Sequence, residues 1–318
     1  MTPLAVYVDT VDADLHDGPA LLREAGFDLR VVVASAPHEV AEAALGATAL
    51  LVGDAPVTAA VLDAAPSLRI VSTVTAGTDH LDLEAARERG VWVSNVPDVS
   101  TEEVAAHALG MALSLIRQLP RFDREVRAGG WDALSGRRPL RPSLMTLGIV
   151  GLGRIGARLA AISRPLYGRV LGSDPALSSA PDGVDLVGLA ELLAESDVVS
   201  LHLPALPGNE RLIDHARLAS MRPGALLVNV ARGGLIDQAA LLTMLDSGHL
   251  GGAALDVLAV EPPDPEEPLL RHPGVLLSPH AAYLSDHSER DGTLRQAENV
   301  VTWARTGRPP RVVVEGRP

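Results

Sequence analysis

Short apolar runs rich in β-branched residues recur along the first third of the chain, and amphipathic stretches separate them. The apolar runs cover residues 4–8, 29–33, 49–52 and 69–73. Helical patterns between them cover residues 19–25, 39–45 and 58–64. Alternation of buried strands with helices predicts a parallel sheet that is covered by helices on both faces.

The alternation of short strands and helices stops at Ser100. Residues 100–118 form a long helical pattern that opens with Ser100 and Thr101 and has Glu103 in its first turn, which is typical of a helix N-terminus. Pro120 is expected to end this helix. The following stretch, residues 129–142, is rich in Gly, Arg and Pro and is interpreted as a crossing between two domains.

A second strand–helix series begins near residue 147. Six further strands, typical of a doubly wound dinucleotide-binding sheet, are predicted at residues 147–150, 169–172, 198–201, 225–230, 252–255 and 275–277. Connecting helices are predicted at residues 156–166, 189–195 and 238–247. A last helix, residues 286–306, follows the closed sheet and is expected to return to the first domain. The fold class is therefore α/β with two Rossmann-like domains, a discontinuous one (1–98 and 286–318) and a continuous one (99–285).

The amino-acid composition restricts the reactions and partners that are possible for this protein. The 318 residues carry a formal net charge of −13, with no Cys and no Lys. An acidic chain without a basic stripe argues against nucleic acid and anionic membranes as partners. Thiolate chemistry and Schiff-base chemistry are excluded, and the scattered His residues predict no metal site. No apolar stretch approaches the roughly 20 residues of a membrane-spanning helix, so a cytoplasmic protein is expected.

A glycine-rich turn predicts a cofactor site. Gly151, Gly153 and Gly156 follow a predicted strand and open a helix, which brings backbone amides and a helix N-terminus to a pyrophosphate. Asp174 ends the next strand, 18 residues after Gly156. A carboxylate there accepts hydrogen bonds from ribose hydroxyls and repels a 2′-phosphate. We therefore expect NAD rather than NADP, while a turn cap before Pro175 is the alternative role of Asp174.

Three loops at the ends of predicted strands carry the candidate catalytic groups: Arg232, Glu261 and His280. A guanidinium can bind a substrate carboxylate through two parallel hydrogen bonds. An imidazole titrates near neutral pH and can therefore deliver a proton, and a carboxylate on its far nitrogen fixes the tautomer. Each residue alone has an ordinary structural role. Together, at one edge of one sheet, they predict reduction of a 2-keto acid.

These residues carry a resemblance to the D-isomer-specific 2-hydroxyacid dehydrogenases that runs almost end to end. The motifs that resemble the family lie at residues 151–156 with Asp174, 201–204, 229–234, 256–262 and 278–282. The resemblance implies a flavodoxin-like substrate domain, an NAD-binding domain, NADH as cofactor and a homodimer to which residues 100–118 contribute. It assigns carboxylate and carbonyl binding to Arg232, proton transfer to His280 and support of that histidine to Glu261.

The same resemblance implies further site residues. Substrate contacts are expected at Arg232, His280 and the loop of Ala76 and Gly77. Cofactor contacts are expected from the glycine loop and Asp174, and from residues on later loops. The full cofactor set is Gly151, Gly153, Arg154, Ile155, Gly156, Asp174, His202, Pro204, Asn209, Val230, Ala231, Asp256, His280, Ala282 and Val104.

Two questions stay open at this point. The segment from His280 to Ser285 is similar to that of the C-terminal-binding transcriptional corepressors, so an NAD-sensing binding protein with vestigial catalysis is the alternative to an enzyme. The substrate class ranges from glyoxylate and hydroxypyruvate to phosphohydroxypyruvate or a bulkier apolar keto acid. The first domain shows no cluster of Arg that could bind a phosphate, which argues against a phosphorylated substrate.

Overall fold

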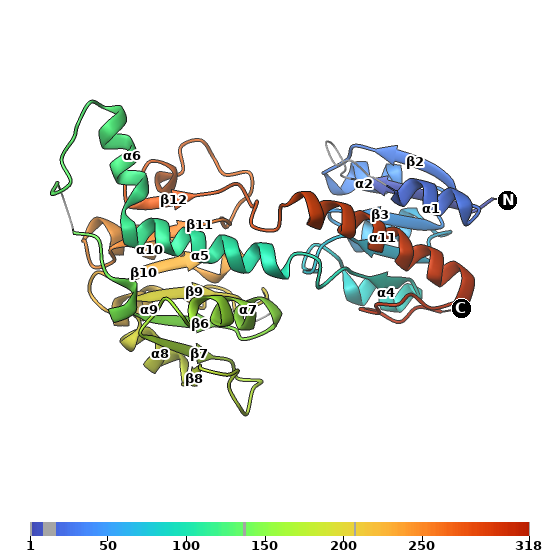
Figure 1. Cartoon of the computed structure of the whole chain (residues 1–318). Helices are drawn as coiled ribbons and strands as arrows, with labels where there is room; N and C mark the ends of the chain where they lie inside the picture. Colours follow the sequence, from blue (N-terminus) through green and yellow to red (C-terminus); the bar gives the residue numbers. More distant parts are fainter. Residues whose placement is uncertain (1, 9–16, 136–137, 207, 318) are drawn as a thin grey trace. The chain divides into compact units, whose positions relative to one another are not determined.

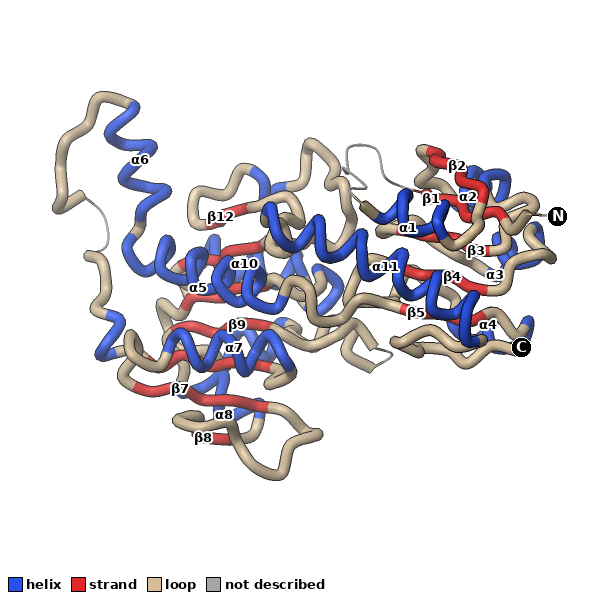
Figure 2. Tube along the Cα trace, turned by 45° about the vertical axis from the view of Figure 1, so that its right-hand side comes forward, coloured by secondary structure: helices blue, strands red, loops and turns tan. Residues whose placement is uncertain are grey.

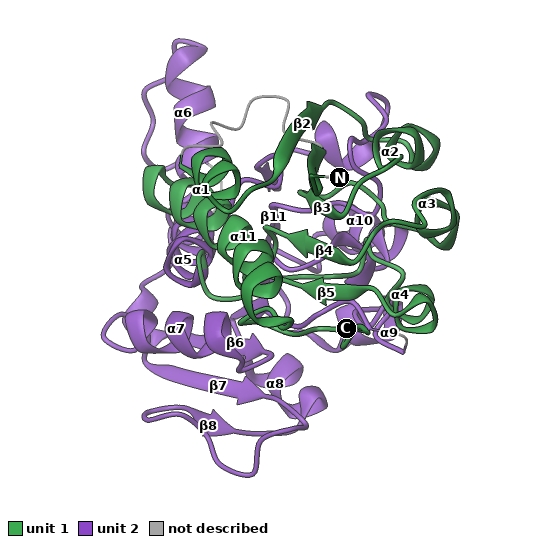
Figure 3. Cartoon of the chain, turned by 90° about the vertical axis from the view of Figure 1, so that its right-hand side faces the viewer, with its two compact units in different colours: residues 1–100, 284–318 green, residues 101–283 purple. Residues whose placement is uncertain are grey.

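The structure, a computed structural model, describes residues 2–8, 17–135, 138–206 and 208–317. The chain divides into two compact units, here called unit 1 (Met1–Ser100 with Leu284–Pro318) and unit 2 (Thr101–Tyr283) (Figure 3). The boundaries expected from sequence were 98/99 and 285/286. Residues 136–137, part of the Gly-, Arg- and Pro-rich stretch 129–142, lie outside the described residues.

Unit 1 is built on a five-stranded parallel sheet with the strand order β2-β1-β3-β4-β5 (Figure 2). Its strands are β1 (Leu4–Val8), β2 (Asp28–Val32), β3 (Ala49–Val52), β4 (Ile70–Thr73) and β5 (Trp92–Ser94). This order, 2-1-3-4-5, is that of flavodoxin-like sheets, whose ligands bind beyond the carboxyl ends of the strands. The predicted fold class of this part is thereby confirmed.

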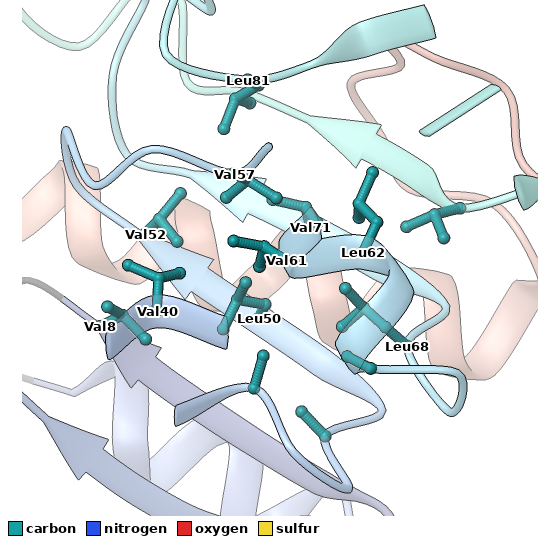
Figure 4. Packing of buried hydrophobic residues seen from close by; sticks show 14 of the residues in the cluster. Val8, Val40, Leu50, Val52, Val57, Val61, Leu62, Leu68, Val71 and Leu81 are labelled. Carbon is teal, nitrogen blue, oxygen red and sulfur yellow. The ribbon is translucent and has the colours of Figure 1, made fainter. Parts of the chain in front are cut away.

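Side chains of these strands alternate between two cores because successive residues of a strand point to opposite faces. Val6 and Val8 join the core under the helices α2 (Pro37–Ala43), α3 (Ala59–Ala64) and α4 (Leu83–Arg89) (Figure 4). Ala5 and Tyr7 join the opposite core. Both faces are therefore buried, as the apolar runs predicted.

The second face of this sheet is covered by helices from both ends of the chain. Helix α1 (Gly18–Glu24) packs against α11 (Asp286–Thr306), which also contacts β3 and β4. The Ser285 hydroxyl caps α11 by accepting from the backbone amides of His287 and Ser288, and Gly307 ends it at φ 81°.

Unit 2 contains a seven-stranded parallel sheet with the order β12-β11-β10-β9-β6-β7-β8 (Figure 1). Counted from β6, the order is that of a doubly wound nucleotide-binding sheet with one added edge strand. The strands are β6 (Thr146–Val150), β7 (Arg169–Ser173), β8 (Asp185–Leu186), β9 (Val198–Leu201), β10 (Leu226–Asn229), β11 (Gly252–Leu255) and β12 (Val275–Leu277). Here too the predicted fold class is confirmed.

Helices cover both faces of this sheet. The helices α5 (Thr101–Arg117) and α7 (Arg154–Ser163) pack together over one face. On the other face lie α8 (Leu189–Glu195), α9 (His215–Ser220) and α10 (Gln238–Asp246). In the part of the chain that the structure describes, no helix is long and apolar enough to cross a bilayer.

The structure corrects two expectations and adds short elements that the sequence did not predict. Pro120 does not close the long helix: α5 ends at Arg117, and Pro120 lies in the first turn of α6 (Leu119–Arg127), where its missing amide proton costs nothing. The described residues of the stretch 129–142 belong to unit 2 and are no crossing between domains. The short elements β5, β8, α4 and α9 were missed, because runs of two to seven residues carry little periodicity.

Candidate active site

The glycine turn after β6 has the shape that a dinucleotide requires. A Cβ on Gly151, which has φ 90°, would lie 2.6 Å from the carbonyl oxygen of His202. A Cβ on Gly156 would lie 2.0 Å from the carbonyl oxygen of Gly151, so helix α7 packs tightly on the turn. Nothing lies within 4 Å of the Cβ position of Gly153, the N-cap of α7. An open backbone at a helix N-terminus fits a pyrophosphate.

Asp174 follows β7 directly and faces this turn. One carboxylate oxygen accepts from the backbone amide of Leu152 at 2.9 Å, and the other accepts from that of Ala176 at 3.0 Å. The second bond is the turn cap considered above. Each carboxylate oxygen can accept more than one hydrogen bond, so Asp174 can hold this turn and still receive ribose hydroxyls.

Six of the other predicted cofactor residues fall into two groups, and Arg154 and Ala231 lie outside both. Val104, Ile155, Val230 and Ala282 come together in one apolar cluster over the α5 face of the sheet. Pro204 and Asn209 lie in the loop after β9, where the Asn209 amide donates to the Pro204 carbonyl at 3.2 Å. Arg154 is exposed on the first turn of α7, and the Ala231 amide donates to the Asn229 side chain at 3.0 Å.

His202 follows β9 and is held by Ser200 of that strand. Its Nε2 lies 2.8 Å from the Ser200 hydroxyl. Burial of the ring lowers the pKa of His202 to about 4, because desolvation penalises the charged imidazolium. The ring is therefore neutral at physiological pH.

This histidine makes the stability of unit 2 depend on pH. The folded pKa lies below the unfolded value of about 6.5, so the unfolded state takes up a proton first and stability falls as pH falls. Between about pH 7 and pH 5 the loss should reach at most about 2 kcal/mol, since the residue keeps part of its surface in solvent. Urea unfolding at both pH values should show a smaller difference for His202→Gln. An equal difference in both proteins would contradict this origin.

Arg232, Glu261 and His280 follow three neighbouring strands, β10, β11 and β12, at the same edge of the sheet. Glu261 Oε2 lies 2.7 Å from His280 Nδ1, and Glu261 Oε1 accepts from the Leu258 amide at 2.7 Å. Among the described residues none hydrogen-bonds to the other ring nitrogen, Nε2. The histidine is thus oriented by a carboxylate and presents one nitrogen for proton exchange.

His280 has an unusual backbone that buried Asp256 holds in place. Its φ is 52°, a left-handed value that non-glycine residues seldom adopt and that clusters at functional sites. The His280 amide donates to the Asp256 carbonyl at 2.8 Å. The Asp256 carboxylate, with the residue only 2% exposed, accepts from the amides of Ala281 and Ala282 at 2.9 and 3.0 Å. These contacts favour an anchoring role for Asp256, which the sequence had placed among the cofactor contacts.

A second anchor reaches this loop from α5. The Ser278 hydroxyl donates to the Asp256 carboxylate, and His107 Nε2 lies 2.9 Å from the same hydroxyl. His107 and Ser278 are 171 residues apart in sequence. No sequence pattern signals this pairing, and sequence reasoning assigned neither residue a role.

The loops of Arg232 and Glu261 are also fitted to each other. A Cβ on Gly233 would lie 1.9 Å from the carbonyl carbon of Leu258, so the two backbones touch where only glycine fits. The Gln238 side-chain oxygen accepts from the Ala259 amide at 2.9 Å and ties the same loop to α10. Arg232 itself donates through Nη1 to the Ala231 carbonyl at 2.8 Å.

In unit 1, the loop after β4 presents backbone amides. Within the described ranges, no residue accepts a hydrogen bond from the amides of Ala76, Gly77 or Thr78. The carbonyls of residues 75–78 are occupied: those of Thr75 and Thr78 accept from the amides of Val96 and Leu81, and those of Ala76 and Gly77 accept from side chains. Successive unpaired amides form an anion-binding backbone, which suits a carboxylate.

Comparison with known proteins decides the family. A sequence profile described as the NAD binding domain of D-isomer specific 2-hydroxyacid dehydrogenases matches residues 109–282. The chain belongs to this dehydrogenase family. The resemblance stated from the motifs is confirmed, and so is NAD as the cofactor class. No group of three or more His, Asp or Glu side chains suited to a metal occurs in the described part of the chain.

Among the relatives, the chain is 38% identical over 269 residues to a glyoxylate reductase of Korarchaeum cryptofilum, covering 81% of this chain and 80% of that protein. It is 41% identical over 254 residues to a D-3-phosphoglycerate dehydrogenase of Mycobacterium tuberculosis, covering 78% of this chain but 47% of the relative. The dehydrogenase described here therefore spans about half the length of that relative.

Solved structures agree with this placement. The TT0316 protein of Thermus thermophilus superposes with a TM-score of 0.89 at 34% identity, covering 98% of this chain and all of that one. A D-lactate dehydrogenase of Aquifex aeolicus, solved with NAD and lactic acid, gives 0.87 at 26% identity and covers 98% of this chain and all of the other. These relatives are reductases and dehydrogenases where their names state an activity, which does not favour the NAD-sensing alternative for this NAD-dependent 2-hydroxyacid dehydrogenase.

Proposed function

We propose that this dehydrogenase reduces a small, unphosphorylated 2-keto acid to the D-2-hydroxy acid, with Arg232, Glu261 and His280 as its catalytic group. The observation that carries the proposal is the 2.7 Å contact between His280 Nδ1 and Glu261 at the edge of the nucleotide-binding sheet. When bound, NADH supplies the hydride. His280 donates a proton from Nε2 to the carbonyl oxygen, so that the carbonyl becomes a hydroxyl.

Arg232 and the loop of Ala76 and Gly77 would bind the substrate. A guanidinium fork binds a carboxylate through two hydrogen bonds, and the three backbone amides that have no acceptor among the described residues can bind one as well. Residues 75–79 include no Arg, and the chain has no Lys, so this loop lacks a cation for a phosphate. The proposed substrate is therefore closer in kind to glyoxylate or hydroxypyruvate than to phosphohydroxypyruvate.

The experiment that tests this function is NADH oxidation, followed by nicotinamide absorbance, against a panel of 2-keto acids. The panel should contain glyoxylate, hydroxypyruvate, phosphohydroxypyruvate and a branched apolar keto acid, with NADPH in parallel. Turnover of a small unphosphorylated acid is expected. No turnover of any acid, together with tight NADH binding by fluorescence, would refute the catalytic proposal and favour the sensor.

Asp174 is proposed to set the cofactor preference. Replacing it with Ala removes the charge that would oppose a 2′-phosphate and removes acceptors for the ribose hydroxyls. We expect Asp174→Ala to weaken NADH use by about tenfold, consistent with loss of a charged hydrogen bond, and to narrow the preference over NADPH. The measurement is kcat/KM for both cofactors. An unchanged ratio of the two values would exclude this role.

We further propose that the protein is a homodimer joined through α6 and the chain that follows it, which continue directly from residues 100–118, where the resemblance places the contact. Figure 1 shows α6 standing away from the sheet of unit 2, and none of its residues is buried. Exposed apolar side chains concentrate on this helix and the residues after it, with Trp131 89% exposed, and monomers seldom present so many together. The other members are Leu119, Val126, Leu134, Leu140 and Leu144. Sedimentation equilibrium of the wild-type protein should give twice the chain mass. Trp131→Asp should lower the measured mass toward that of one chain. A wild-type protein that sediments as a monomer would contradict the proposal.

A further inference from the structure

We propose that Thr75 and Asn95 are positioning residues for substrate binding, because their side chains fix the direction of the unpaired amides of Ala76, Gly77 and Thr78. This inference rests on the proposed function, in which these amides bind the carboxylate of the keto acid. It adds two side chains of unit 1 to the determinants of substrate affinity. Neither is proposed to touch the reacting atoms.

Because the peptide group is planar, the direction of each carbonyl in this loop fixes the direction of the amide that follows it. In a planar trans peptide the carbonyl oxygen of one residue and the amide hydrogen of the next point in opposite directions. A side chain that captures a carbonyl therefore also sets where the following amide points. Each amide of this loop is preceded by a captured carbonyl.

The two central carbonyls are captured by side chains. Asn95 Nδ2 donates to the Ala76 carbonyl at 2.8 Å, which directs the Gly77 amide away from Asn95. The Thr75 hydroxyl donates to the Gly77 carbonyl at 2.7 Å, which directs the Thr78 amide away from Thr75. The Ala76 amide is directed in the same manner, since the Val96 amide donates to the Thr75 carbonyl at 3.3 Å.

Both positioning residues are themselves supported by the fold. The Thr75 hydroxyl lies 2.7 Å from that of Thr73, the last residue of β4, and the Thr75 amide donates to the Thr73 hydroxyl at 3.2 Å. The Asn95 carbonyl accepts from the side chain of Asn299 at 3.2 Å. Asn299 is 3% exposed on α11, so the helix that returns to unit 1 braces the loop. The amides are thus held in place before any ligand arrives, which lowers the entropic cost of binding.

The test compares Thr75→Val, which keeps the shape but removes the hydroxyl, with Thr75→Ser, which keeps the hydroxyl. We expect Thr75→Val to raise KM for the keto acid by about five- to tenfold, the effect of one neutral hydrogen bond. The turnover number and the Kd for NADH should change less than about twofold, since the chemistry and the cofactor residues lie in unit 2. Thr75→Ser should retain the wild-type KM.

A dead-end ligand separates binding from chemistry. Oxamate, an amide analogue of a 2-keto acid, should bind Thr75→Val more weakly by the same factor as the change in KM. Asn95→Ala acts on the neighbouring carbonyl and should also raise KM and the oxamate Ki, which keeps the test open if Thr75→Val does not fold.

The outcomes distinguish the two proposals. Wild-type turnover with an unchanged KM in both Thr75→Val and Asn95→Ala would overturn the positioning role alone. A raised KM in Thr75→Ser equal to that in Thr75→Val would also overturn it, because the hydroxyl would then not be the cause. A wild-type protein that neither reduces any keto acid nor binds oxamate would overturn the proposed function itself.

Discussion

Replacing His280 with Ala is expected to lower kcat for keto acid reduction by about 10²- to 10⁴-fold, the usual contribution of a general acid. The imidazole is oriented through Nδ1 by Glu261 at 2.7 Å and by the Asp256 anchors of its backbone, so the variant loses a proton donor that the fold holds in a fixed place. The measurement is steady-state turnover with saturating NADH. The Kd for NADH should change far less than kcat.

A matched control tests whether the loss of turnover is specific to His280. His38 is an exposed histidine on α2 in unit 1, and His38→Ala should leave kcat at the wild-type value. Glu261→Gln should reduce kcat less than His280→Ala, because the amide oxygen can still accept from Nδ1 but no longer stabilises a charged ring. Near-normal turnover of His280→Ala would remove His280 from the mechanism and leave the keto acid without its proposed proton donor.

Much of the fold could be predicted because its signals are local. Buried strands of both sheets have runs of Val, Leu and Ile that are visible without any tertiary information, and β1 was predicted at the bounds it has, Leu4–Val8. Helix α6 was not predicted, because its short apolar stripe of Leu119, Phe122 and Val126 is set among charged residues and no residue of the helix is buried. The proline in its first turn is also an ambiguous signal, since proline both ends helices and opens them.

The residues of the candidate site also divide into those that local sequence signals reveal and those that only the structure reveals. Arg232, Glu261 and His280 could be proposed from residue type and from their place after strands, and the structure puts Glu261 and His280 in contact. Their supports could not be proposed. The contact of His107 with Ser278, and the opposition of Gly233 to Leu258, depend on where distant segments meet, which single-sequence patterns do not encode.

Gly233 offers the sharpest test that the catalytic loops act as one fitted unit. A Cβ there would lie 1.9 Å from the Leu258 carbonyl carbon and 2.4 Å from the Ala259 nitrogen, both of them backbone atoms, so Gly233→Ala must displace one loop. The Leu258 amide holds Glu261, and Glu261 holds His280. A displacement of about 1 Å at such a site can cost about 10²-fold in rate. We therefore expect kcat/KM to fall by about that factor and stability to fall by about 1–3 kcal/mol.

The adjacent glycine, Gly234, provides the control for the Gly233→Ala prediction. Nothing lies within 4 Å of the Cβ position of Gly234, and its φ is not left-handed, so Gly234→Ala should keep near-wild-type activity and stability. Both variants add one methyl group to the same short loop and differ only in what that methyl group meets. If Gly233→Ala loses stability but retains kcat/KM, the contact with Leu258 matters for packing alone. If both variants lose activity equally, the loop needs glycine flexibility, and the backbone contact does not explain the loss.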